Sequence, residues 1–242
     1  MEYLFPSKCK FVDTYSIDRS RKNCATMFTE GMRPHVTKED INLPSGYQGK
    51  LAFVLHNVLT EEECNRFIQE TERIGYIPAL VNVGGGREKM MTDVRSSKRC
   101  IVDSVPYVQE LWERIKEFIP SVFKEHRVLG LNERLRFLRY DAGDYFRPHF
   151  DGSYKRDNGE RSYITFQLYL NEGFEGGATT FIGVQHDLVP VIPKTGSVLI
   201  FQHDICHEGS ELTAGRKYTV RTDIMSSAER VDSVNTSSSC EL

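Results

Sequence analysis

Residues 162–171 read SYITFQLYLN, and this stretch decides the fold. Every second side chain from Ile164 to Leu170 is apolar, whereas those between them, such as Thr165 and Gln167, are polar and uncharged. Alternation with a period of two predicts a half-buried β-strand. An uncharged polar face suits a pocket wall with fixed hydrogen-bond donors, and an ordinary half-exposed strand has the same pattern.

The same alternation recurs in six more short runs, which are separated by Gly, Asn, Asp and Pro. They are residues 135–140, 145–151, 178–182, 187–192, 197–202 and 217–225. Seven short strands at this spacing predict a β-sandwich or barrel rather than a parallel sheet with crossover helices.

Two helices are predicted ahead of these strands. Thr60 can cap a helix over residues 61–75, and Glu63, three residues further on, completes a capping box. Apolar residues at helical spacing predict a second helix over about 105–119, which Pro120 stops. We expect both helices to pack against the larger β unit.

The 242 residues are enough for one domain with a sizeable core. We expect that domain to span 49–226, after an N-terminal arm or lid over 1–48 and before a disordered Ser-rich tail over 227–242.

The net charge of -3 argues against a protein built to bind nucleic acid. The chain contains no apolar run long enough for a membrane span or a secretion signal. Six scattered cysteines without a Cys-x-x-Cys predict reduced thiols and a cytoplasmic location, with the nucleus left open.

His149 and Asp151 are two residues apart in the run over 145–151, so both side chains point to one face of a strand. One imidazole and one carboxylate are two of the three ligands in the facial triad of non-haem Fe(II) oxygenases. Taken alone, the pair is equally compatible with a solvated strand, because seven histidines make one such spacing by chance unsurprising.

A third ligand has to come from later in the chain, where His186, His203 and His207 are the candidates. His186 lies in a polar turn and is expected to face solvent. His203 and His207 follow the apolar run at 197–202, and His207 also directly precedes the final strand. His207 is therefore the preferred third ligand.

The final strand carries two cations, Lys217 and Arg221, on the same face as Thr219 and Asp223. Such a face ordinarily meets solvent. If it lines a pocket instead, the cations require an anionic ligand, because a buried charge without a partner is costly. A dicarboxylate is such a ligand, and an arginine can hold it bidentately.

Several segments, taken together and in order, resemble the prolyl 4-hydroxylase-like group of 2-oxoglutarate- and Fe(II)-dependent dioxygenases. They are residues 132–152 (NERLRFLRYDAGDYFRPHFDG), 161–165, 169–171, 174–181 (FEGGATTF), 193–197 (PKTGS), 207–209, 215–218 (GRKY) and, upstream, 53–64. The resemblance covers about residues 50–226. It implies a mainly β fold with flanking helices around a double-stranded β-helix, or jelly-roll, core.

The resemblance also implies a metal site and a cosubstrate anchor. The family's His-x-Asp falls on His149 and Asp151, and its distal histidine falls on His207. Lys217, about ten residues further on, matches the basic residue that pairs with the far carboxylate of 2-oxoglutarate.

Three more residues are implied around that anchor. Tyr169 matches a tyrosine that hydrogen-bonds the same carboxylate, and Tyr140 matches one on the cosubstrate side of the pocket. Arg221 departs from the best-known prolyl hydroxylases, which have uncharged residues there. It can replace or assist Lys217, or bind substrate, and Lys217 is the preferred anchor.

The implied reaction is a hydroxylation coupled to oxidative decarboxylation of 2-oxoglutarate, with Fe(II), O2 and ascorbate. The substrate, a prolyl or other residue of a protein or else a small molecule, stays open, as does the oligomeric state. Arg147, on the His149 face, and Arg95, in a polar loop, are candidates for substrate contact or closure, or for solvent exposure.

Two alternative classes remain. A cupin-like metal enzyme that does not use 2-oxoglutarate leaves Lys217 and Arg221 without a role. A catalytically inactive jelly-roll interaction module does not require a complete set of metal and anion ligands.

Overall fold

One large sheet dominates the computed structural model, which describes residues 15–16, 27–29, 35–82 and 88–231. Its strands are β1 (Tyr15–Ser16), β2 (Thr37–Asp40), β3 (Ala52–His56), β4 (Ile77–Pro78), β7 (Lys98–Asp103), β8 (Val122–Phe123), β9 (His126–Leu131), β10 (Arg134–Asp141), β12 (Arg161–Tyr169), β16 (Val198–Gln202) and β19 (Arg216–Arg230). The main path has the order β1-β7-β10-β19-β12-β16-β3-β2. The long β19 lies between β10 and β12, so the final strand of the sequence is central in the sheet.

A smaller, four-stranded sheet forms a second layer. It has the order β11-β17-β14-β15, from β11 (Phe146–His149), β17 (His207–Gly209), β14 (Thr179–Ile182) and β15 (Leu188–Val191). Two short ribbons, β13 (Glu175–Gly176) with β18 (Leu212–Ala214) and β5 (Val81–Asn82) with β6 (Glu88–Lys89), complete the strands. The predicted jelly-roll, with all seven predicted strands, is confirmed.

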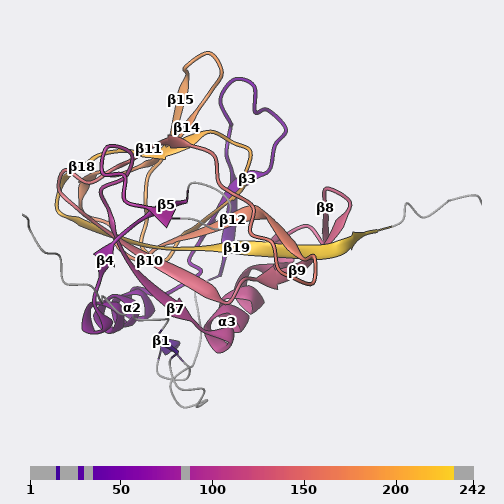
Figure 1. Cartoon of the computed structure of the whole chain (residues 1–242), viewed down its shortest axis with the longest axis horizontal. Helices are drawn as coiled ribbons and strands as arrows, with labels where there is room; N and C mark the ends of the chain where they lie inside the picture. Colours follow the sequence, from indigo (N-terminus) through magenta and orange to yellow (C-terminus); the bar gives the residue numbers. More distant parts are fainter. Residues whose placement is uncertain (1–14, 17–26, 30–34, 83–87, 232–242) are drawn as a thin grey trace, which may run out of the picture.

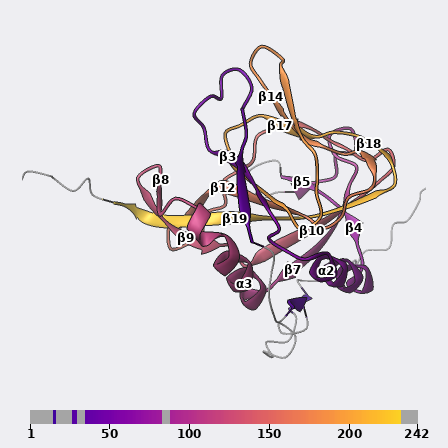
Figure 2. The same cartoon turned by 180° about the vertical axis from the view of Figure 1, so that it is seen from behind.

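The helices cover the other face of the large sheet. Figures 1 and 2 place α2 (Glu61–Ile74) and α3 (Val105–Ile115) on the side opposite the small sheet. Their apolar side chains, with Phe67 and Leu111, join a core that contains Ile164 and Phe166 of β12. Because β12 turns its apolar face to the helices, its polar face points toward the small sheet.

Both helices form at their predicted positions. The predicted helix over 105–119 ends earlier, since α3 stops at Ile115 and a 3-10 turn, Lys116–Phe118, follows. The capping box of α2 is complete, because Thr60 Oγ1 accepts from the Glu63 amide at 3.2 Å and Glu63 Oε2 accepts from the Thr60 amide at 2.9 Å.

Replacing Thr60 by alanine is expected to lower the free energy of unfolding by about 1 kcal/mol, since the Glu63 amide loses its acceptor at the helix start. Chemical denaturation measures this change. Thr60→Ser, which keeps the hydroxyl, is the control. Equal stability of the alanine and serine variants would show that the cap contributes nothing.

Parts of the predicted arm and tail belong to the large sheet. Within the arm over 1–48, β2 pairs with β3, and β19 continues to Arg230, beyond the predicted domain end at 226. The rest of the tail from 232, and residues 1–14, 17–26 and 30–34 of the arm, lie outside the described residues. Cys64, Cys100 and Cys206 are free thiols. Among the described residues, no helix has the length and hydropathy needed to cross a bilayer.

Candidate metal centre and pocket

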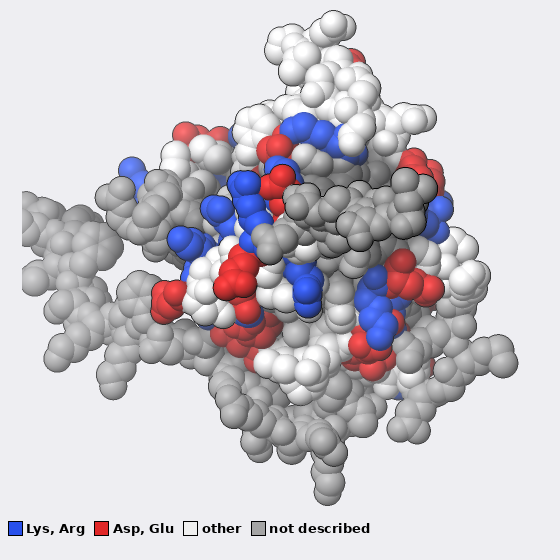
Figure 3. Space-filling model, turned by 90° about the vertical axis from the view of Figure 1, so that its right-hand side faces the viewer, with Lys and Arg blue, Asp and Glu red and all other residues white. Residues whose placement is uncertain are grey.

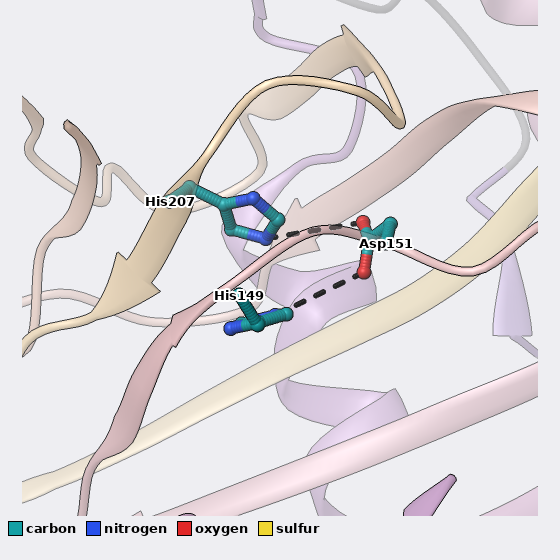
Figure 4. A group of neighbouring side chains, drawn as sticks. All are labelled: His149, Asp151 and His207. Atoms are coloured by element: carbon teal, nitrogen blue, oxygen red, sulfur yellow. Dashed lines mark ion pairs between the residues drawn. The ribbon is translucent and has the colours of Figure 1, made fainter. Parts of the chain in front are cut away.

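Two histidines meet because of strand pairing in the small sheet. β11 and β17 run antiparallel, and His149 lies directly opposite His207 in their register. Asp151 follows β11, and its oxygens lie 3.9 Å from Nε2 of each histidine (Figure 4). One ligating atom from each of the three residues lies within 4.8 Å of the others.

The surroundings of this triad favour the protonation states that bind a metal. His149 Nδ1 lies 2.7 Å from the Arg147 carbonyl, and His207 Nδ1 lies 3.0 Å from the Ile205 carbonyl. Because a carbonyl only accepts, each Nδ1 carries the proton and each Nε2 keeps its lone pair. Burial lowers the pKa of His149 to about 3 and also lowers the pKa of His207, so both rings are neutral at pH 7.

Asp151 is held in place by three contacts. Its amide donates to the His203 carbonyl at 3.2 Å, and Thr165 donates its hydroxyl to Oδ2 at 2.5 Å. Arg221 Nη2 lies 2.9 Å from Oδ1. Burial raises the pKa of Asp151, but the adjacent Arg221 guanidinium lowers it by more, so the net pKa lies well below its usual range. The group is therefore an ionised carboxylate.

The triad opens on a cavity of about 610 Å³ between the two sheets. Its floor is the polar face of the large sheet, with Gln167 of β12 and Tyr140 of β10. The face of β19 identified from the sequence also lines it, namely Lys217, Thr219, Arg221 and Asp223. That face therefore meets the pocket and not bulk solvent.

Lys217 is the least compensated charge on this floor. Its side chain is buried, Nζ donates to the Gly177 carbonyl at 2.5 Å, and no carboxylate pairs with it among the described residues. Gly177 has a φ of +66°, and a Cβ there would lie 2.8 Å from Leu212 Cδ1, so glycine suits this position. Burial alone lowers the pKa of Lys217 to about 7.

Arg221 has a different environment, because two carboxylates already pair with it. Besides Asp151, it lies 3.5 Å from Asp223, which also lies 3.5 Å from His203 Nε2. Burial lowers the pKa of Arg221, but the two carboxylates raise it above its usual value. His203, a candidate ligand in the sequence, is thus buried against Asp223 and is not part of the metal-binding group found among the described residues.

Tyr140 and Tyr169 lie on two sides of Lys217, with ring centroids 5.2 and 5.6 Å from Nζ. Tyr140 lines the cavity. Tyr169 is fully buried behind Thr179, and its hydroxyl donates to Thr179 Oγ1 at 2.8 Å. Thr179 itself lines the cavity.

Further lining residues were not predicted to reach the site. Arg136 and Leu138 share the Tyr140 face of β10, and a period of two counted back from Tyr140 would have found them. Of the two arginines considered in the sequence for substrate contact or closure, Arg95 lines the cavity. Arg147 is exposed and lies over the Tyr145 ring, 4.1 Å from its centroid. His186 is exposed, as expected.

The sequence of this chain resembles those of several known proteins. Residues 135–222 match the family described as the 2OG-Fe(II) oxygenase superfamily. Probable prolyl 4-hydroxylase 10 of Arabidopsis thaliana is 30% identical over an alignment of 175 residues that covers 62% of this chain and 57% of that protein. Probable prolyl 4-hydroxylase 3 of the same plant is 30% identical over an alignment of 139 residues that covers 54% of this chain and 45% of that protein. The chain spans about half the length of the curated relatives it matches.

Solved structures share the fold. A prolyl-4-hydroxylase of Pseudomonas putida superposes with a TM-score of 0.54 at 16% identity, over 74% of this chain and 94% of its own. A prolyl hydroxylase of Trichoplax adhaerens, solved with a hypoxia inducible factor peptide fragment, gives 0.57 at 15% identity, over 74% and 84%. At these identities the likeness shows the fold alone. By its sequence, the chain is similar to prolyl 4-hydroxylases and, over residues 135–222, to the 2OG-Fe(II) oxygenase superfamily.

Proposed function

We propose that this protein is a 2-oxoglutarate-dependent hydroxylase whose Fe(II) is held by His149, Asp151 and His207. The observation that carries the proposal is the joining of two features in one cavity. A triad in metal-binding form lies at its wall, and a buried lysine without a carboxylate partner among the described residues lies on its floor.

The donor set fits the metal. Two neutral imidazoles and one carboxylate are the ligands that non-haem Fe(II) oxygenases use, and three protein ligands leave positions open for other groups. The backbone carbonyls behind each Nδ1 and the Thr165 hydroxyl behind Asp151 orient the three ligands. When bound, iron and 2-oxoglutarate supply the oxidising chemistry, which uses O2, and we propose ascorbate as the reductant.

The role of the other residues is to bind and orient the cosubstrate. We propose that Lys217 pairs with the far carboxylate of 2-oxoglutarate and that Tyr140 forms the adjacent wall. Tyr169 would act at the same carboxylate together with the Thr179 hydroxyl to which it donates. Arg221 is the weaker candidate for this anchor, because Asp151 and Asp223 already neutralise it.

For the substrate, we propose a residue of a protein, prolyl or other, as the names of the relatives suggest. We also propose a cytoplasmic or nuclear location, and a catalytic domain over residues 49–226 between the arm or lid over 1–48 and the tail over 227–242, with β2 of the arm and the end of β19 at Arg230 joined to its large sheet.

Succinate formation from 2-oxoglutarate tests the proposed function. The purified chain with Fe(II), ascorbate and 2-oxoglutarate is expected to form succinate even without substrate, and a chelator should stop it. A protein that binds metal without consuming 2-oxoglutarate would favour a cupin-like enzyme. A protein that binds neither would favour an inactive interaction module.

Replacing Thr165 by valine is expected to weaken metal binding by about tenfold. Valine keeps the shape of threonine but cannot donate to Asp151 Oδ2. Titration with Fe(II) under argon, or with Mn(II), gives the affinity. Thr165→Ser, which restores the donor, should bind like the wild type, and an unaffected valine variant would rule out this orienting role.

A further inference from the structure

The cavity is lined by more positive charge than the Asp151 carboxylate and one 2-oxoglutarate would neutralise. Five cationic side chains and three carboxylates line it: Arg95, Arg99, Arg136, Lys217 and Arg221, against Asp151, Glu208 and Asp223. One of the three carboxylates belongs to the triad. In contrast, acidic and basic side chains are interspersed on the outer face shown in Figure 3.

Two of these cations, Lys217 and Arg221, lie at separate ends of the floor. In the register of β10 and β19, Lys217 lies opposite Tyr140, whereas Arg221 lies opposite Arg136, four residues further along. Four residues of extended strand span about 13 Å. A five-carbon dicarboxylate is only about as long as two residues of strand, so a molecule held by Lys217 does not reach Arg136.

Arg95 lines the cavity next to a candidate metal ligand, where its guanidinium hydrogen-bonds Tyr140 and its charge interacts with that of Arg221. Its guanidinium lies 4.6 Å from the Phe146 ring centroid, and that ring stacks on His149 with centroids 3.6 Å apart. Arg95 Nε donates to Ser97 Oγ at 2.7 Å. Its Nη2 is buried without a hydrogen-bond partner, and no carboxylate pairs with Arg95, among the described residues. A guanidinium held this way offers free donors to an anion.

Arg136 is only partly compensated on the floor beneath. Its Nη1 lies 3.4 Å from Asp223, a long contact, and Asp223 is shared with Arg221. One buried carboxylate therefore serves two arginines, and Arg221 has a second, closer partner in Asp151. At this end of the floor, Arg136 therefore has more remaining capacity to bind an anion than Arg221.

We propose that Arg95 and Arg136 bind an anionic group of the substrate, a carboxylate or a phosphate, close to the carbon that is hydroxylated. The inference rests on the proposed function and specifies its substrate class. If the hydroxylated residue is itself uncharged, as proline is, the anion belongs to a neighbouring residue of the peptide. Planar guanidinium groups match both oxyanions bidentately, so the two sources share one chemistry.

Paired probes test the inference on the full chain under argon, with Fe(II) and saturating 2-oxoglutarate to fill the Lys217 end. The pairs are N-acetyl-glutamate amide against N-acetyl-glutamine amide, and N-acetyl-phosphoserine amide against N-acetyl-serine amide. We expect each acidic probe to bind at least about tenfold more tightly than its neutral partner. The acidic probe that binds more tightly shows whether the site prefers a carboxylate or a phosphate.

Arg95→Gln and Arg136→Gln should each remove most of this preference and leave the affinity for 2-oxoglutarate within about twofold. Arg127→Gln, at an exposed position on β9, is the matched control and should change neither quantity. Equal binding of acidic and neutral probes overturns the inference. So does an Arg95→Gln variant whose affinity for 2-oxoglutarate falls as much as its affinity for the acidic probe. Failure of the wild type to bind 2-oxoglutarate contradicts the proposed function instead, and succinate formation detects that separately.

Discussion

Replacing His207 by alanine is expected to reduce succinate formation more than about hundredfold and to abolish stoichiometric metal binding. Loss of groups behind a metal ligand already costs about 10–100-fold, and loss of the ligand itself costs more. The imidazole is buried, and its Nε2 faces Asp151 directly across from His149, so no other described side chain can take its place. Metal content after gel filtration and succinate formation are the two measurements.

The other histidines considered in the sequence are natural controls. His186 is exposed and has a φ of +63°, so asparagine, which tolerates this conformation, is the suitable replacement. His186→Asn should retain both metal and turnover. His203→Ala should keep the metal, because His203 faces Asp223 and not the triad. A His207→Ala protein that keeps its iron, or a His203→Ala protein that loses it, would refute the ligand assignment.

The predictable part of the fold is the part with a clear period. The strand at 162–171 turns one face to a helix-covered core and one to the pocket, so its sequence alternates throughout. Strand β3 was not predicted, because its first four residues are buried and form a short apolar run without alternation, which does not distinguish strand from helix. Strand β7 begins with Lys98 and Arg99, and such a charged start resembles a loop although the strand forms part of the cavity floor.

Periodicity alone could relate site residues only where they are close in sequence or share a strand face, and His207 was instead selected by its position before the final strand and by the family resemblance. His149 and Asp151 are two residues apart, and Lys217 and Arg221 lie on one strand, so periodicity relates each pair. Nothing in the sequence shows that β11 pairs with β17, which brings His207 opposite His149. The same limit concealed the contact of Arg221 with Asp151, because it joins β19 of the large sheet to a residue that follows β11 of the small sheet.

Replacing Lys217 by alanine is expected to weaken 2-oxoglutarate binding about hundredfold. A hydrogen bond to a charged group contributes roughly 1.5–3 kcal/mol, and each 1.4 kcal/mol is a factor of ten in affinity. In the ligand-free protein, Nζ reaches only the Gly177 carbonyl and has no carboxylate partner among the described residues, so the incoming anion supplies the missing countercharge. Calorimetric titration with Fe(II) under argon measures the affinity without turnover.

The wild-type affinity should also depend on pH, with a sign fixed by burial. Burial lowers the pKa of Lys217 to about 7, so the free site is cationic below pH 7 and increasingly neutral above it. A bound carboxylate favours the charged form and raises that pKa again. Above pH 7, binding therefore requires uptake of a proton, and the affinity should fall by up to about tenfold per pH unit.

The same linkage applies to folding. Without ligand, the protein should become less stable as the pH falls from about 10.5 to 7, because in that range the Lys217 amine binds a proton only in the unfolded chain.

Two variants separate this anchor from its rival. Lys217→Arg keeps a cation at every pH, so any binding it retains should vary little with pH between 7 and 9. Arg221→Ala leaves Lys217 untouched but removes the partner of Asp151, so its main defect should be in metal affinity and not in 2-oxoglutarate affinity at saturating metal. The reverse outcome, with full binding in Lys217→Ala and lost binding in metal-loaded Arg221→Ala, would assign the far carboxylate to Arg221. The Arg95 and Arg136 end of the cavity would then adjoin the cosubstrate, and the residual positive charge there would no longer argue for an acidic substrate.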